Sequence, residues 1–139
     1  MKTTRAKIVR LLMDYFGTDD RRIEHALKVL FHAEQIYKAA PEGDEDILIA
    51  VALLHDIGIK VSEQELGYNT GKTQEQYGPP IAGRLLASIA FPPEKLEIVK
   101  HIIGNHHSPS RYAYPELKIL KEADRIVNEQ ETIASLMDG

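Results

Sequence analysis

The sequence predicts an all-α fold, a compact bundle of five to six main helices in a single domain spanning residues 1–139. Apolar residues recur at helical spacing along most of the chain, and no segment shows sustained alternation of apolar and polar residues. Glycine and proline interrupt this pattern at the expected helix ends. With 139 residues, 43% of them hydrophobic, the chain is large enough to bury one core without disulfides or metal staples.

Three helices are expected in the first 58 residues. The first covers residues 4–16 and ends at Gly17, and the second covers roughly residues 19–39. The third begins at the acids of residues 44–46, which suit a helix N-terminus, and ends near residues 56–58. Because this third helix is apolar nearly all round, we expect it to be the central, buried one.

The second half of the chain should contain a long loop and three more helices. Residues 60–75 carry two glycines and many polar groups, which predict a loop with at most one helical turn. The prolines of residues 77–80 are expected in the first turn of the next helix. Another helix is expected over about residues 93–105, followed by a loop at 107–114. Pro115 is expected to open the last helix.

Charge and hydropathy narrow the classes of partner. The net charge of −4 and the pI of 5.9 argue against general nucleic-acid binding, which needs a basic field, but allow a small phosphorylated ligand. The longest apolar run is too short to cross a bilayer, and no secretory signal is apparent, so no membrane partner and a cytoplasmic location are expected. Assembly into a homo-oligomer stays open.

The doublet His55-Asp56 is the most informative feature of the chain. It ends the apolar run of residues 47–54, where an imidazole and a carboxylate are costly to bury without partners. Together they can bind one divalent metal ion. Further ligand candidates are His25, the pair His106-His107 and Asp124. Because the chain has no cysteine, any metal must be held by His, Asp, Glu or water.

The ordered set His25, His55-Asp56 and Asp124 resembles the HD-domain superfamily of metal-dependent phosphohydrolases. Residues 53–60 (LLHDIGIK) resemble the central signature of that family, residues 22–29 (RIEHALKV) its first-histidine helix, and residues 121–126 (KEADRI) its closing helix. The resemblance spans roughly residues 20–130. It implies an HD-type α-helical hydrolase in which His25, His55, Asp56 and Asp124 hold one divalent metal ion: Mn, Fe, Mg, Ni, Co or Zn.

The resemblance also raises the question of a second metal near His106 and His107. Some HD families hold two metals by means of extra histidines, but they usually add another His near the start of the helix after the HD loop. Residues 75–83 contain none. We therefore expect one tight metal, with a weaker second site or a phosphate-binding role for the pair. His106 is a candidate general acid. The alternative is that the pair simply caps a helix C-terminus.

Several cations are candidates for contact with a substrate phosphate. Lys60 follows the doublet closely and is also a catalytic candidate, Arg22 lies nearly one turn before His25, and Arg125 follows Asp124. The alternative for each is a solvated surface charge.

The resulting hypothesis is a metal-dependent phosphoric ester hydrolase acting on a nucleotide or another small phosphorylated metabolite. Asp56 would bridge or orient the attacking water. One alternative keeps the fold without efficient catalysis, as a regulatory module that binds metal and nucleotide. The lowest-ranked alternative is a di-iron oxygenase-type HD protein, which needs a fuller ligand set.

Overall fold

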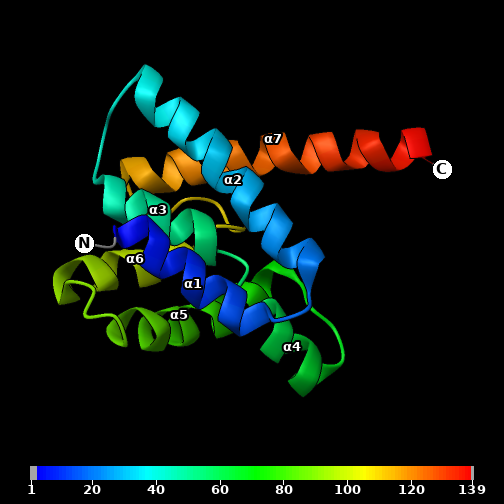
Figure 1. The fold of residues 1–139 in the computed structure, drawn as a ribbon, viewed down its shortest axis with the longest axis horizontal. Helices are drawn as coiled ribbons and strands as arrows, with labels where there is room; N and C mark the ends of the chain where they lie inside the picture. Colours follow the sequence, from blue (N-terminus) through cyan, green and yellow to red (C-terminus); the bar gives the residue numbers. More distant parts are fainter. Residues whose placement is uncertain (1–2, 139) are drawn as a thin grey trace.

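The computed structural model describes residues 3–138, and this part of the chain contains seven helices and no strand (Figure 1). The helices are α1 (Thr4–Phe16), α2 (Asp20–Ala39), α3 (Glu45–Leu54), α4 (Ile59–Leu66), α5 (Gly71–Ala87), α6 (Pro93–Ile103) and α7 (Pro115–Asp138). The predicted all-α fold is confirmed. The helix that the prediction lacked is α4.

Helix α3 is the centre of the molecule, as its sequence predicted. Every residue from Ile47 to Leu54 is buried, and α1, α2, α6 and α7 all pack against this helix. Asp44 caps its N-terminus by accepting a hydrogen bond from the Ile47 amide at 3.0 Å, and its carboxylate also pairs with Lys95 at 2.9 Å. The buried Glu116 accepts from the Asp44 amide, which ties α3 to the start of α7.

The prediction that residues 60–75 form a loop was wrong. Helix α4 occupies most of the segment and ends at Gly67, which adopts the left-handed conformation (φ +79°). Thr70 then begins α5 through a reciprocal cap, in which its side chain accepts from the Thr73 amide and the Thr73 side chain accepts from the Thr70 amide. Pro79 and Pro80 therefore lie inside α5 rather than in its first turn.

The close approach of α4 and α5 depends on glycine. A Cβ atom on Gly58, which precedes α4, would lie 2.7 Å from the backbone nitrogen of Gly78 in α5. No larger residue fits at Gly58 without moving α4 or α5, and a Cβ atom on Gly78 would lie 2.7 Å from the Ile103 side chain of α6. This packing holds α5 against α4 directly after the C-terminal end of α3, where His55 and Asp56 lie.

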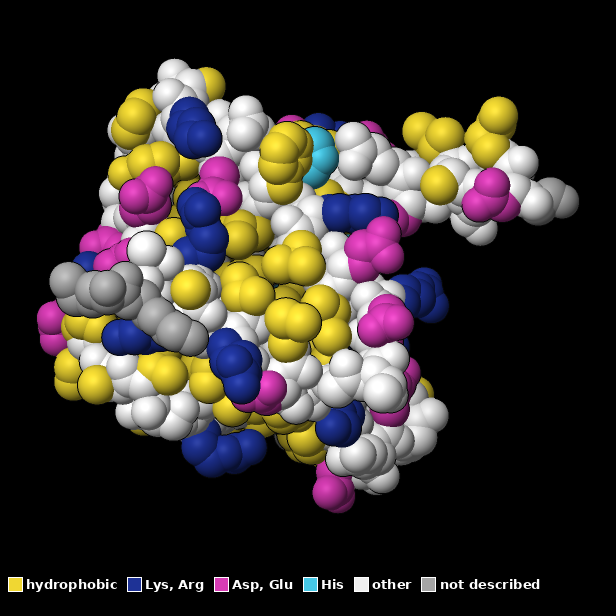
Figure 2. Space-filling view, in the orientation of Figure 1, with side chains coloured by type: hydrophobic (Ala, Val, Ile, Leu, Met, Phe, Trp, Pro, Cys, Tyr) yellow, Lys and Arg dark blue, Asp and Glu magenta, His cyan; other side chains and the backbone are white. Residues whose placement is uncertain are grey.

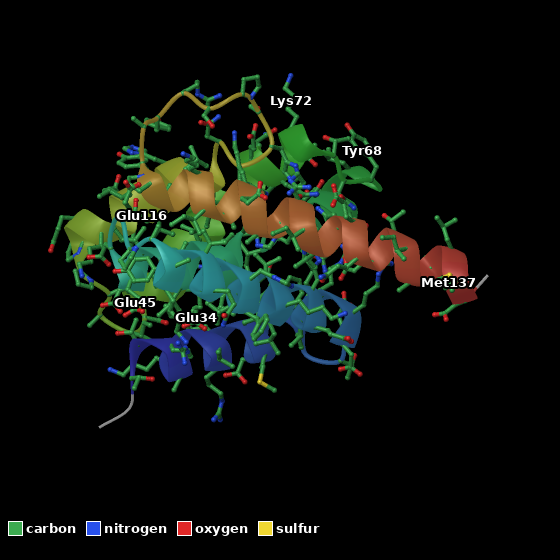
Figure 3. All side chains as sticks on the ribbon, turned by 90° about the horizontal axis from the view of Figure 1, so that it is seen from above. Glu34, Glu45, Tyr68, Lys72, Glu116 and Met137 are labelled. Atoms are coloured by element: carbon green, nitrogen blue, oxygen red, sulfur yellow. The ribbon has the colours of Figure 1, made fainter. Side chains whose placement is uncertain are left out.

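Helix α7 lies alongside α2 and then extends past the rest of the molecule (Figures 1 and 3). Met137 marks its projecting end in Figure 3, and Figure 2 shows apolar side chains along this end. Ile133, Leu136 and Met137 are 60%, 76% and 81% exposed. Within residues 3–138, no helix combines the length and apolar character that a membrane span requires.

Candidate metal centre

His55 and Asp56 directly follow the last residue of α3, the helix that is buried from Ile47 to Leu54. His55 is fully buried, and its Nδ1 lies 2.9 Å from the carbonyl oxygen of Ala52. That carbonyl can only accept, so Nδ1 carries the proton and donates. The Nε2 atom is thereby directed at two carboxylates, 3.3 Å from Asp56 Oδ2 and 3.3 Å from Asp124 Oδ1.

The other two predicted ligands reach the same point from neighbouring helices. His25 comes from α2 and Asp124 from α7, and these two helices pack side by side. His25 Nε2 lies 3.1 Å from Asp124 Oδ1 and 3.5 Å from Asp56 Oδ2. The structure thus brings His25, His55, Asp56 and Asp124 together in one half-buried cluster, which we call the HD cluster.

The electrostatics of the cluster favour bound positive charge. Burial alone would raise the pKa of Asp56, but the adjacent His55 and the contact with His106 hold it well below its ordinary value. Burial would likewise raise the pKa of Asp124, but its contacts with His25 and His55 lower it. Conversely, burial would lower the pKa of His55, yet the two carboxylates raise it well above its ordinary value. The two ionised carboxylates are therefore stabilised by positive charge. This charge comes either from protons on the imidazoles or from a metal ion that displaces these protons.

The donor set fits a divalent metal ion. Among the described side chains, the Nε2 atoms of His55 and His106 are buried without a hydrogen-bond partner, which is rare in native proteins. His25, His55 and Asp56 each offer a ligand atom, and these atoms lie within 4.8 Å of one another. The same holds for Asp56, His106 and His107. Imidazole and carboxylate ligands suit several divalent metals, so the set does not select one.

His106 both caps the end of α6 and faces the HD cluster, and the sequence left both roles open. Its Nδ1 donates to the carbonyl of Ile103 at the end of α6, as a helix cap would. Its Nε2 faces the cluster, 3.9 Å from Asp56 Oδ1. The fully buried Asn105 holds this turn in place, because its side chain donates to the Pro109 carbonyl and accepts from the Arg111 amide.

His107 is held by the first turns of α5. Its Nε2 lies 2.7 Å from Gln74 Oε1, and its backbone amide donates to Glu75 at 2.9 Å. Burial and the neighbouring His106 lower the pKa of His107, so its ring is neutral at physiological pH and donates from Nε2 to Gln74. Gly71 leaves room for the ring, since a Cβ there would lie 2.8 Å from His107 Cβ.

The three predicted phosphate-binding cations lie in three different surroundings. Arg22 lines the cavity in front of it, near Asp19 and Glu63. Arg125 lines a second cavity and pairs with two glutamates of α7. Lys60 is not brought to the site, because its ammonium donates to the Tyr15 carbonyl at 3.2 Å and lies 5.1 Å above the Tyr15 ring.

A polar cavity of about 220 Å³, which we call the inner cavity, lies in front of the cluster. Besides predicted residues it is lined by side chains that the sequence analysis missed: Arg21, Ile59, Asn69, Gln74, Asn128 and Glu131. Glu131 contacts His25 Nδ1 at 3.0 and 3.2 Å, so it orients the imidazole from behind. Asn128 and Glu131 follow Asp124 by four and seven residues, so helical spacing alone could have found them.

Comparison with known proteins gives the family. The family model for the HD domain matches residues 22–129. This chain belongs to the HD domain family. The fold agrees, because the structure superposes on the crystal structure of a predicted HD superfamily hydrolase from an uncultured Thermotogales bacterium with a TM-score of 0.70 and 25% sequence identity. That match covers 94% of this chain and 74% of the Thermotogales chain.

Curated relatives match most of this chain but only part of their own length. The chain is 27% identical to the 3'-5' exoribonuclease YhaM of Oceanobacillus iheyensis over 107 residues, which are 72% of this chain and 33% of that protein. It is 31% identical to the uncharacterized protein L432 of Acanthamoeba polyphaga mimivirus over 116 residues, 81% of this chain and 48% of the viral one. The chain therefore spans a third to about half the length of these relatives.

Proposed function

We propose that this HD domain is a metal-dependent phosphohydrolase acting on a nucleotide or another small phosphorylated molecule. One observation carries the proposal: a half-buried cluster of two imidazoles and two ionised carboxylates, in which the Nε2 atom of His55 has no hydrogen-bond partner, opens onto a polar cavity. The names of the relatives support it, since YhaM is an exoribonuclease and the solved structure is called a predicted hydrolase.

His25, His55, Asp56 and Asp124 would hold the metal, with a weaker second site near His106 and His107 as the alternative. When bound there, a divalent ion lowers the pKa of water and neutralises charge on the phosphoryl oxygens.

The remaining chemistry is proton transfer. In this proposal Asp56 orients the attacking water and His106 is the proton donor. The water oxygen forms a bond to phosphorus and gives up its proton to Asp56. The bond from phosphorus to the ester oxygen breaks, and that oxygen takes the Nε2 proton of His106, which acts in its doubly protonated form because Nδ1 already donates to the Ile103 carbonyl. Arg22 lines the approach and would contact phosphate oxygens.

The test is a panel of phosphoesters assayed with Mn, Mg, Co, Ni, Fe and Zn. We expect phosphate release above a metal-only control. The variant Asp56→Ala should lose both bound metal and turnover, because Asp56 is a ligand and orients water. Asp14→Ala is the matched control, since Asp14 lies on the exposed face of α1 and pairs only with Arg10 among the described side chains. An Asp56→Ala protein with full activity would refute the proposal.

A second candidate is a regulatory module that binds metal and nucleotide without efficient turnover. Gln74 favours it, because this amide rather than an imidazole faces His107 from the start of α5. The same panel separates the two. Thermal stabilisation by metal and nucleotide without phosphate release would favour the regulatory module, and turnover would favour the enzyme.

A further inference from the structure

A continuous series of side-chain hydrogen bonds leads from α4 along the inner cavity to His107. The Asn69 amide group donates to Glu63 Oε2 at 2.7 Å, and Gln74 Nε2 donates to Asn69 Oδ1 at 3.0 Å. His107 Nε2 lies 2.7 Å from Gln74 Oε1. The Arg22 guanidinium lies 3.5 Å from Glu63 Oε2 and anchors the far end. We call the side chains of Glu63, Asn69 and Gln74 the amide relay.

The direction of every bond in the amide relay follows from its first member, Glu63. A carboxylate can only accept, so the NH2 group of Asn69 faces Glu63 and its carbonyl oxygen faces Gln74. That oxygen can also only accept, so the NH2 group of Gln74 faces Asn69, and Gln74 Oε1 faces His107. Because Gln74 Oε1 needs a donor, His107 Nε2 carries the ring proton.

The packing at the start of α5 fixes the relay in place. Gln74 is only 8% exposed. The preceding residue, Thr73, is buried as well, and its hydroxyl lies 2.7 Å from the hydroxyl of the buried Ser62 in α4. Turning the Gln74 amide over would set two donors against each other at His107 and two acceptors at Asn69. Unpaired polar groups are costly where water is excluded, so the relay holds one direction.

His107 therefore has the opposite tautomer to the two imidazoles beside it. Nδ1 of His55 and Nδ1 of His106 each donate to a backbone carbonyl, and their Nε2 atoms have no hydrogen-bond partner among the described residues. His107 instead donates from Nε2, and its free lone pair is on Nδ1. That nitrogen lies beside the start of α5, since a Cβ atom on Gly71 would be 3.3 Å away from it.

The tautomer of His107 bears on how many metal ions the site can hold. Asp56, His106 and His107 are close enough to share an ion. An imidazole nitrogen binds a metal only through a lone pair, and Nε2 of His107 has none while its proton is donated to Gln74. An ion bound through that nitrogen would have to displace the proton and leave Gln74 Oε1 without its donor.

We propose that the amide relay holds His107 as the tautomer protonated on Nε2, and that this tautomer excludes a second metal ion from the group of Asp56, His106 and His107. Glu63, Asn69 and Gln74 are thus positioning residues. The exclusion of a second ion rests on the proposed function, because it presupposes a first ion on the HD cluster, whereas the tautomer assignment does not.

Long-range proton–nitrogen NMR correlations test the tautomer, because they distinguish a protonated ring nitrogen from one with a lone pair. In the full chain, freed of paramagnetic metal by chelation, His107 should be protonated on Nε2 alone. Gln74→Leu removes the acceptor and Asn69→Leu removes the group that directs it, so each should give a mixture of tautomers. Asn69→Asp should retain the wild-type tautomer, because its carboxylate still accepts from Gln74. Glu65→Gln is the matched control, since Glu65 is exposed on α4 outside the relay.

Equilibrium dialysis against excess manganese tests the exclusion of a second ion. Wild type and Glu65→Gln should bind one ion per chain, and Gln74→Leu should take up a second, weaker ion because Nε2 of His107 is freed. A tautomer mixture in wild type, or an unchanged single tautomer in Gln74→Leu, would overturn the relay. Two ions on wild type, or only one on Gln74→Leu, would overturn the exclusion. A single tautomer in wild type that binds no ion at all would support the relay and refute the metal centre of the proposed function.

Discussion

Replacing Glu75 should loosen the turn that carries His106 and His107. The Glu75 carboxylate accepts three hydrogen bonds from this turn: from the His107 amide at 2.9 Å, from the Ser108 amide at 2.8 Å and from the Ser108 hydroxyl at 2.5 Å. Burial alone would raise the pKa of Glu75, but these bonds hold it below its ordinary value, so the group is ionised at neutral pH.

The expected magnitude follows from the number and type of these bonds. Hydrogen bonds to charged groups contribute about 1.5–3 kcal/mol each when buried, and this turn is partly exposed, so Glu75→Ala should lower the free energy of unfolding by about 2–4 kcal/mol. Glu75→Gln keeps one acceptor oxygen for the two amides and should cost only about 1 kcal/mol.

Urea unfolding at neutral pH measures both variants, and an unchanged denaturant slope would show that the unfolded state is not altered. Two results would refute the reasoning: a loss below about 0.5 kcal/mol in Glu75→Ala, which is the scatter of ordinary surface changes, or equal losses in the two variants.

Three further predictions concern other parts of the molecule. Burial alone would raise the pKa of Asp44, but its capping and lysine contacts lower it. Asp44→Asn should therefore destabilise the protein above pH 4, and its stability should match that of the wild type as the pH falls through the native pKa of Asp44. Thermal melts across pH measure this difference. Gly58→Ala should lower stability by about 1–3 kcal/mol through its clash with Gly78, read by urea unfolding; an unchanged midpoint would contradict the close packing. Glu131→Gln should weaken metal retention about tenfold by releasing His25, measured by competition with a chelator; unaltered retention would show that Glu131 does not orient the imidazole.

Much of the fold could be predicted from the periodicity of the sequence. The buried α3 and the helix ends at Gly17 and Pro115 followed from local rules. Helix α4 did not, because it is short and mostly polar, and the glycines at both of its ends suggested a loop. The true start of α5 was missed because glycines and prolines suggested a loop, whereas the Thr70 cap begins a helix that accommodates both prolines.

The residues of the candidate site were likewise predicted only in part. The order of His25, His55, Asp56 and Asp124 predicted residues that the structure brings together. Gln74 and Glu75 could not be found from the sequence, since their contacts with the 107–108 turn cross more than 30 residues and depend on how α5 packs. Lys60 was a candidate because of its position in the sequence, but helix α4 carries it to the side of α1.

The arrangement of α7 has a consequence for how substrate preference can diverge among such proteins. One rigid helix carries Asp124, which belongs to the HD cluster, and two turns further along it carries Thr132 and Ile133, which line a cavity of about 660 Å³. A change at either of the latter positions reshapes the cavity without altering the backbone that holds the carboxylate. Under the proposed function, single substitutions there would change the molecule that is bound while the reaction is kept.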